Sequence, residues 1–165
     1  MNIFLCGSNQ LTALDRKEIK AFLLDYAHKH KIHILCYKSI ENEVLHFFIE
    51  NEHLAPNLCL YTLQSLHLLT DEFQEAVDYL KAYGAQYITF DYPYDSIYRS
   101  EYMSFIKQIV EDSQLVLCFY NGDKHTSVIP VDIAKDAGVD AVIYDLPGLQ
   151  QNQVKKSFEQ KIRMM

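Results

Sequence analysis

The stretch QLVLCFYNGDKHTSVIPVDIAK, residues 114–135, combines three elements that decide the fold. Its first part, 114–120, is a continuous apolar run of the kind found in buried strands. A short polar loop with one glycine, Gly122, follows, and then a helix that Thr126 or Ser127 can cap and whose first turn accommodates Pro130. The stretch therefore predicts a strand, a loop and a helix in succession, a layout that often binds a phosphate or a ribose.

The same alternation of strand and helix extends over the whole chain. Repeated strand–helix units favour parallel strands joined by right-handed crossovers, and uniformly apolar strands suit a sheet covered on both faces. We therefore predict a Rossmann-like α/β fold, a three-layer α/β/α sandwich with a mostly parallel sheet. The expected strands are 2–7, 32–37, 57–63, 86–92, 114–120 and 140–145, and the expected helices are 14–30, 39–51, 70–85, 99–111 and 127–138.

The length of 165 residues suits one domain with a proper core. We expect a single Rossmann-like domain over 1–148, because a polar tail with a weak helical pattern, 149–165, begins after Pro147 and Gly148. The role of this tail stays open, as does the formation of a homo-oligomer.

The charge pattern narrows the classes of partner. A net charge of −7 and dispersed lysines and arginines disfavour binding to nucleic acid or to an anionic membrane. No apolar run approaches the length of a membrane span, and the first residues lack the basic start of a signal peptide, so we expect a cytoplasmic protein. The cysteines at 6, 36, 59 and 118 all fall in predicted strands, and in a reducing compartment they are expected to be core thiols.

Ligands of such sheets bind at the carboxyl ends of the strands, near the switch in strand order. After the first strand, Gly7 permits close backbone approach and Ser8 adds a hydroxyl. After the second, Lys38 can bind an anion. Glu43 lies near a helix start, where a carboxylate commonly interacts favourably with the helix dipole. Arg99 falls in the first turn of a helix and opposes that dipole, so we expect it to have a carboxylate or an anionic ligand as partner.

The loop after the fifth strand completes the candidate binding set. Lys124 and His125 stand where a glycine-rich loop would contact a phosphate through its backbone. They are either side-chain substitutes for such contacts or the mark of a site that has drifted away from phosphate. The candidate ligand-binding residues here are Asn121, Gly122, Lys124, His125, Thr126 and Ser127.

Metal and triad chemistry are disfavoured. His28, His30 and His33 flank the amino end of the second strand, away from the expected crevice. No H-E-x-x-H spacing and no G-x-S-x-G elbow is present. We expect neither a metal ion nor a cofactor.

Taken in order, these features resemble the SLOG superfamily, which includes the Smf/DprA and LOG proteins and is related to nucleoside deoxyribosyltransferases. The region 97–145 resembles it best, and the motifs are degenerate: glycines are missing after the second strand, and no Gly-Thr pair follows the fifth. The counterparts are Gly7-Ser8, YKSIENE ending at Glu43, Arg99-Ser100, and EDSQLVLCFYNGDKHTS followed by the helix VIPVDIAK.

This resemblance implies a nucleotide-type small-molecule ligand. Hydrolases and transferases of the superfamily use a carboxylate in the helix after the fifth strand, and Asp132 is the nearest match, where it would touch the ribose or attack the anomeric carbon. Three functions follow. We rank nucleotide or nucleotide-derivative binding or sensing first, an N-glycosidase or nucleoside deoxyribosyltransferase second, and a protein-interaction domain with a relic crevice third.

Overall fold

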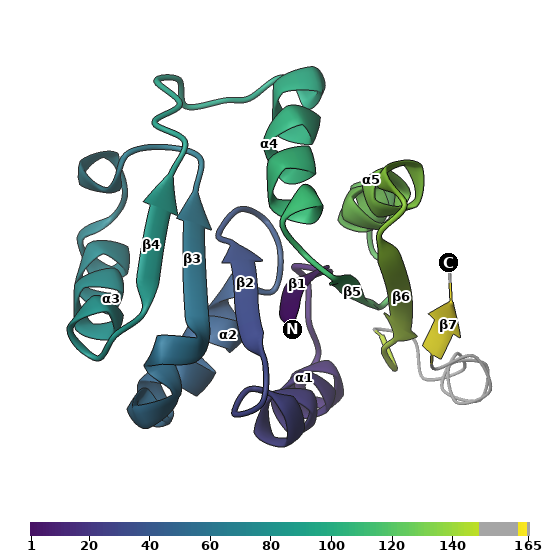
Figure 1. Ribbon diagram of the computed structural model, residues 1–165, viewed down its shortest axis with the longest axis horizontal. Helices are drawn as coiled ribbons and strands as arrows, with labels where there is room; N and C mark the ends of the chain where they lie inside the picture. The colour runs from purple at the N-terminus through teal and green to yellow at the C-terminus, as the bar shows by residue number, and fades with distance from the viewer. Residues whose placement is uncertain (149–161, 165) are drawn as a thin grey trace.

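The computed structural model describes residues 1–148 and the backbone of 162–164, and its centre is one mixed sheet (Figure 1). Six strands are parallel, and a short seventh pairs antiparallel with β6. The order in the sheet is β4-β3-β2-β1-β5-β6-β7. The strands are β1 (Asn2–Gly7), β2 (Lys31–Leu35), β3 (Leu58–Thr62), β4 (Gln86–Thr89), β5 (Leu115–Tyr120), β6 (Asp140–Asp145) and β7 (Ile162–Met164).

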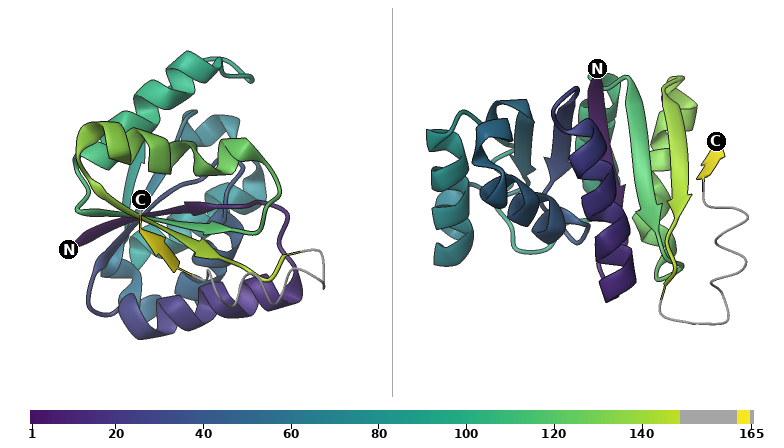
Figure 2. Two further views of the ribbon diagram at one scale, coloured as in Figure 1. Left: turned by 90° about the vertical axis from the view of Figure 1, so that its right-hand side faces the viewer. Right: turned by 90° about the horizontal axis from the view of Figure 1, so that it is seen from below.

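Helices cover both faces of this sheet (Figure 2). Helices α1 (Ala13–Tyr26), α2 (Glu41–Glu50) and α3 (Asp71–Ala82) pack side by side on one face. Helices α4 (Arg99–Glu111) and α5 (Ile129–Ala137) pack against each other on the opposite face. The predicted three-layer, Rossmann-like sandwich is confirmed. Short 3₁₀-helices η1 (Glu52–Asn57), η2 (Leu66–Leu68) and η3 (His125–Val128) complete the described elements.

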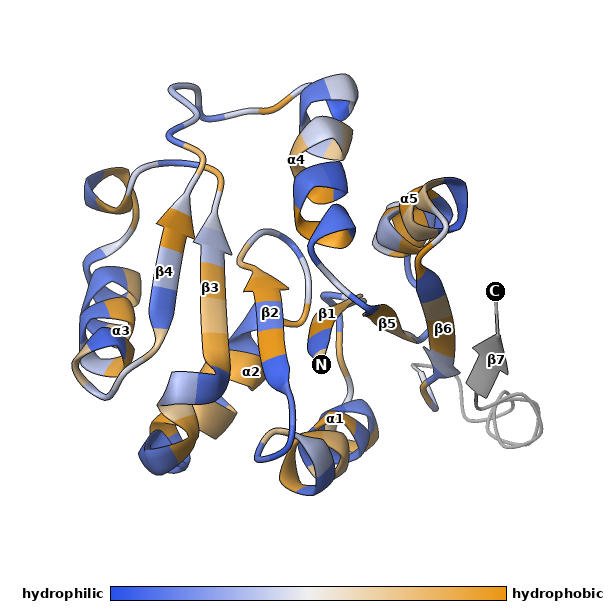
Figure 3. Ribbon diagram, in the orientation of Figure 1, coloured by the Kyte–Doolittle hydropathy of each residue, from blue (hydrophilic) through white to orange (hydrophobic). Residues whose placement is uncertain are grey.

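The strands bury alternate side chains in two apolar cores, one under each helical layer. Leu5, Ile34 and Leu60 point toward α1–α3, whereas Phe4 and Cys118 point toward α4 and α5. Figure 3 shows helices with both apolar and polar residues, as expected of elements that cover a sheet with one face only. This two-sided burial explains why the strands read as continuous apolar runs.

The helix ends follow from local capping chemistry. Thr12 accepts a bond from the Asp15 amide and Asp15 accepts one from the Thr12 amide, which makes a complete capping box at α1. Thr70 caps α3 by accepting a bond from the Phe73 amide. Helices α2 and α4 begin after Ile40 and Tyr98, which make no side-chain cap bond.

The chain switches direction through the sheet at β1. From β1 it proceeds outward to β2, β3 and β4, then returns through α4 to β5 on the other side of β1. The crevice of such a sheet lies where these two directions diverge, at the carboxyl ends of β1 and β5.

The last residues were expected to form a polar, helical tail over 149–165. Residues 149–161 and 165 of that tail lie outside the described residues, and Ile162–Met164 form β7. In the described part of the chain, no helix has both the length and the apolar character needed to cross a membrane.

Candidate functional site

A cavity of about 320 Å³ opens at the switch point. Its walls come from the carboxyl end of β1, from the loops that follow β2 and β5, and from the start of α4 and α5. The topology predicts a ligand site in this arrangement. The lining residues are Cys6, Gly7, Tyr37, Lys38, Ser39, Ile97, Arg99, Tyr102, Lys124, Thr126, Ser127, Ile129 and Pro130.

Three cations line this cavity: Lys38 after β2, Arg99 at the start of α4 and Lys124 after β5. Across the described residues, none of the three forms an ion pair, and no Asp or Glu lines the cavity with them. Lys38 also has a left-handed backbone, with φ of 47°, and its Nζ lies 5.2 Å from the centre of the Tyr37 ring. Unpaired cations that converge in a concave site create an attractive potential for an anion.

The β1 and β2 walls are joined by Ser39. The Gly7 amide donates to Ser39 Oγ at 2.9 Å, and the Ser39 hydroxyl lies 3.3 Å from the Gly7 carbonyl oxygen. Gly7 itself has φ of 153°, and a Cβ there would lie 2.1 Å from the Phe119 carbonyl oxygen. Only glycine therefore permits this approach of β1 to β5.

The β1 and β5 walls are joined by Asp123, which the sequence reasoning did not select. Asp123 Oδ1 accepts bonds from the Ser8 hydroxyl at 2.8 Å, the Lys124 amide at 2.7 Å and the Ser127 hydroxyl at 3.1 Å. Asp123 Oδ2 accepts a bond from the Asn9 amide at 3.2 Å. One carboxylate therefore fixes the turn after β1 against the segment that carries Lys124.

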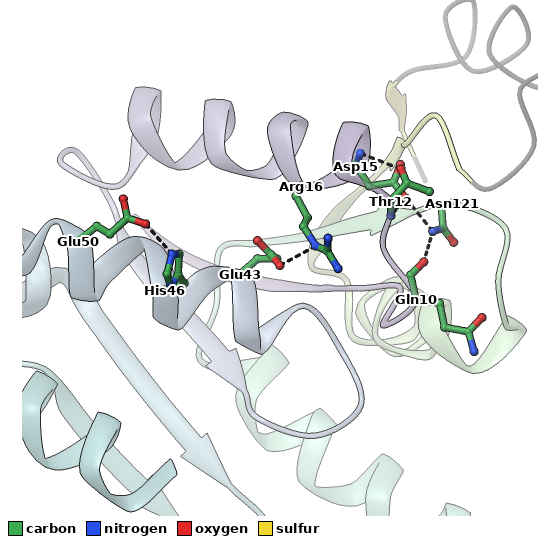
Figure 4. A network of polar contacts seen from close by, with 8 residues as sticks. All are labelled: Gln10, Thr12, Asp15, Arg16, Glu43, His46, Glu50 and Asn121. Carbon is green, nitrogen blue, oxygen red and sulfur yellow. Dashed lines mark hydrogen bonds and ion pairs between the residues drawn. The ribbon is translucent and has the colours of Figure 1, made fainter. Parts of the chain in front are cut away.

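Ser8 and Asn121 are buried behind the cavity, where they hold its loops together. Ser8 Oγ accepts a bond from the Asn121 amide at 3.0 Å. The Asn121 side chain donates to the Gln10 carbonyl at 2.6 Å and to Asp15 at 2.9 Å, as Figure 4 shows for this side of the molecule. Asp15 in turn accepts the Gly148 amide at 2.9 Å, which ties the segment after β6 to α1.

The structure brings six of the predicted site residues to the cavity wall and leaves six elsewhere. Ser8 and Asn121 lie behind the wall, Gly122 and His125 are exposed in the loop, and Asp132 is exposed on α5. Glu43 pairs with Arg16 at 3.0 Å on the α1–α2 side. The six at the wall are Gly7, Lys38, Arg99, Lys124, Thr126 and Ser127.

Glu41, two residues before Glu43, is the carboxylate nearest to this part of the site in sequence. Residues two positions apart in an α-helix are rotated by about 200° around its axis, so Glu41 and Glu43 lie on opposite sides of α2. Glu41 accepts the Ser39 amide at 2.7 Å and so stabilises the turn that holds Lys38. Burial raises the pKa of Glu41, and hydrogen bonds from backbone amides oppose that rise.

The cavity floor is neutral. A hydrogen bond with Cys118 and burial raise the pKa of the Cys6 thiol well above its ordinary value. Burial likewise raises the pKa of Tyr102. Both groups stay protonated near pH 7, so the cations at the rim dominate the charge of the site.

No protein-family model matches the sequence, and no curated protein matches it. Among solved structures, the chain is similar to DNA processing protein A (DprA) from Streptococcus pneumoniae, with a TM-score of 0.63 and 11% sequence identity. The similarity covers 96% of this chain and 54% of that one, so this chain spans about half the length of its neighbour. At this identity the likeness shows a common Rossmann-like fold alone.

Proposed function

We propose that the chain binds a nucleotide or nucleotide derivative in the switch-point cavity and is a SLOG-type binding or sensing module. The observation that carries the proposal is the convergence of Lys38, Arg99 and Lys124 on a cavity without a lining carboxylate, among the described residues of a chain whose net charge is −7. Arginine and lysine are the usual partners of phosphate groups, and hydroxyls of Ser39, Thr126 and Ser127 add polar contacts at the same wall.

The volume supports a small ligand. Ligand cavities commonly measure about 300–1,000 Å³, and 320 Å³ lies at the lower end of that range. Apolar and aromatic side chains (Tyr37, Ile97 and Tyr102) form the part of the wall that would contact a base. A mononucleotide suits this combination of size, charge and apolar wall.

DNA is a second candidate ligand, because the neighbour of similar fold is a DNA processing protein. The acidic net charge opposes sequence-independent attraction to a polynucleotide, so contact with DNA would depend on the same three cations. An oligonucleotide therefore belongs in the binding test.

An N-glycosidase or deoxyribosyltransferase is the alternative activity. A carboxylate must approach the anomeric carbon to within about 3–3.5 Å, and Asp132, which the family resemblance selects, is exposed on α5 and does not line the cavity. Release of free base from nucleosides and nucleoside monophosphates, compared between the wild type and Asp132→Ala, tests this activity.

A protein-interaction domain with a relic crevice is the third alternative. Such a crevice would be filled by its own side chains, such as Tyr92, Tyr94 or Lys38. Tyr92 and Tyr94 line a separate cavity of about 50 Å³ beside it, and Lys38 lines the switch-point cavity, where about 320 Å³ stays open. The available volume at the switch point favours ligand binding.

Thermal denaturation with a ligand panel tests the proposal. Nucleoside mono-, di- and triphosphates, ADP-ribose derivatives and a short single-stranded oligonucleotide are added separately. We expect at least one mononucleotide-type ligand to raise the melting temperature of the wild type in a saturable way. Absence of a shift across the panel would contradict nucleotide binding, and a shift with the oligonucleotide alone would favour DNA.

A further inference from the structure

We infer that Asp123 is the positioning residue of the cavity: it fixes the segment 124–127 and so aims the Lys124 side chain at the bound anion. This inference rests on the proposed function and adds to it a group that does not itself line the cavity.

The Asp123 carboxylate binds the segment 124–127 at both of its ends. The Lys124 amide, at the start, and the Ser127 hydroxyl, at the end, both donate to Asp123 Oδ1. The Ser127 amide donates to the Lys124 carbonyl at 3.1 Å, which makes the segment one short turn. Because Lys124 and Ser127 are clamped together, their side chains reach the cavity as a unit.

The same carboxylate anchors that turn to the centre of the sheet. Ser8 is fully buried, and its hydroxyl donates to Asp123 while it accepts the Asn121 amide. The Asn9 amide adds a second bond from the β1 side. Without Asp123, the remaining constraints on where Lys124 lies relative to Gly7 would be covalent continuity, the η3 backbone and the bond from the Cys118 thiol to the Ser127 carbonyl at 3.3 Å.

The charge of Asp123 and its hydrogen bonds have opposite effects on ligand affinity, so the direction of the change in affinity tests the inference. A carboxylate near a cationic cavity repels an anionic ligand, so removal of its charge alone strengthens binding. Loss of its hydrogen bonds releases Lys124 and weakens binding. Asn at this position retains an acceptor oxygen for Ser8, Lys124 and Ser127 and removes the charge, at the cost of the Asn9 amide bond. Ala removes the charge and every one of these acceptors.

The experiment measures the affinity for adenosine 5′-monophosphate by calorimetric titration in Asp123→Ala and Asp123→Asn. We expect Asp123→Ala to weaken binding about tenfold, and Asp123→Asn to bind as tightly as the wild type or more tightly. Tighter binding by both variants would show that Asp123 acts only as a repulsive charge and would overturn the inference.

A double-mutant cycle distinguishes positioning from general loss of structure. In a Lys124→Met background, Asp123→Ala should cost about twofold or less, because the cation that it positions is already gone. In a Lys38→Met background, Asp123→Ala should retain its full effect. Equal losses in both backgrounds would assign Asp123 a structural role without a link to Lys124.

Amide hydrogen exchange, measured without ligand, keeps this inference separate from the proposed function. We expect the amides of 124–128 to exchange faster in Asp123→Ala than in the wild type, and Asp123→Asn to restore most of the protection. Failure of the wild type to bind any nucleotide would remove the proposed function. Unchanged exchange in Asp123→Ala would remove the positioning role, whatever the ligand.

Discussion

Two hollows in this molecule contain similar charged side chains and differ in how those charges are balanced. The switch-point cavity has three cations and no lining carboxylate among the described residues. The groove between α1 and α2, of about 200 Å³, is lined by cations and acids together: Arg16 pairs with Glu43 and His46 with Glu50 (Figure 4). Lys17 and Lys20 also line the groove, but the acids beside them reduce its attraction for a further anion. We therefore expect an anion to bind the cavity in preference to the groove.

The largest effect is expected from a substitution that disrupts the cavity itself. Gly7→Ala places a Cβ 2.1 Å from the Phe119 carbonyl oxygen, so β1 and β5 must separate. We expect the free energy of unfolding to fall by about 4 kcal/mol or more, measured by chemical denaturation.

Gly122→Ala is the matched control for that change. Gly122 also has positive φ, 88°, but no atom lies within 4 Å of its added Cβ. Only backbone strain remains, and a loss of about 1–2 kcal/mol is expected. Similar losses in the two variants would contradict the close-approach role of Gly7.

Removal of the cavity cations sharpens the comparison without unfolding the protein. In the triple variant Lys38→Met/Arg99→Met/Lys124→Met, affinity for the best ligand of the panel should fall at least about 100-fold, because hydrogen bonds to charged groups contribute about 1.5–3 kcal/mol each. Calorimetric titration measures the change. Arg16→Met in the groove is the control, and an equal loss there would mean that both hollows attract the ligand by general charge.

A buried histidine makes the stability of the folded protein depend on pH, which limits the pH range in which binding at the cavity and at the groove can be compared. Burial lowers the pKa of His33 to about 4, whereas its ordinary value is 6.5. His33 Nδ1 contacts the Tyr61 hydroxyl at 2.9 Å, and its Nε2 has no hydrogen-bond partner among the described residues. Since the unfolded chain binds the proton more tightly, stability is complete above about pH 6.5 and is lost as the pH falls from there toward about 4.

We expect this loss to be about 2 kcal/mol, once the pKa shift is discounted for screening by nearby solvent. Urea denaturation of the wild type and of His33→Gln across this pH range measures it. The variant should be less stable at pH 7 and should show a flatter profile. An identical pH profile in the two proteins would exclude His33 as the cause.

Ionic strength gives the smallest expected effect. Attraction between an anion and solvent-accessible cations is screened by salt, so affinity for a nucleotide should fall about fivefold between about 0.05 M and about 0.3 M salt. Titrations in sodium chloride measure it. Affinity independent of salt would indicate that apolar contact with the wall, rather than the cations, dominates binding.

The fold could be predicted from the sequence because it depends on local chemistry. Much of the site could not be predicted, because it depends on hydrogen bonds between residues far apart in the sequence. The strand run 115–120 depends on the apolar character of neighbouring residues, and the sequence pattern identified it. The contact of Asp123 with Ser8 joins residues 115 positions apart, and no local pattern reveals it.

Glu43 and Glu41, which lie within one turn of α2, also show that the sequence alone does not reveal which side chain stabilises the site. Glu43 was selected because it ended a motif, yet the helix directs it toward Arg16, while Glu41 stabilises the turn of Lys38. Lys38, Arg99 and Lys124 were predicted separately from their places after strands, and their convergence on one cavity required the strand order.

An NMR titration of the wild-type chain with adenosine 5′-monophosphate tests the central claim most directly, because backbone amide shifts locate the ligand. We expect saturable shifts at Gly7, at Lys38 and Ser39, and at 124–127 around the cavity, while amides of Arg16, Lys17 and Lys20 in the groove stay unchanged. Shifts confined to the groove, or no saturable shift at any amide, would contradict it.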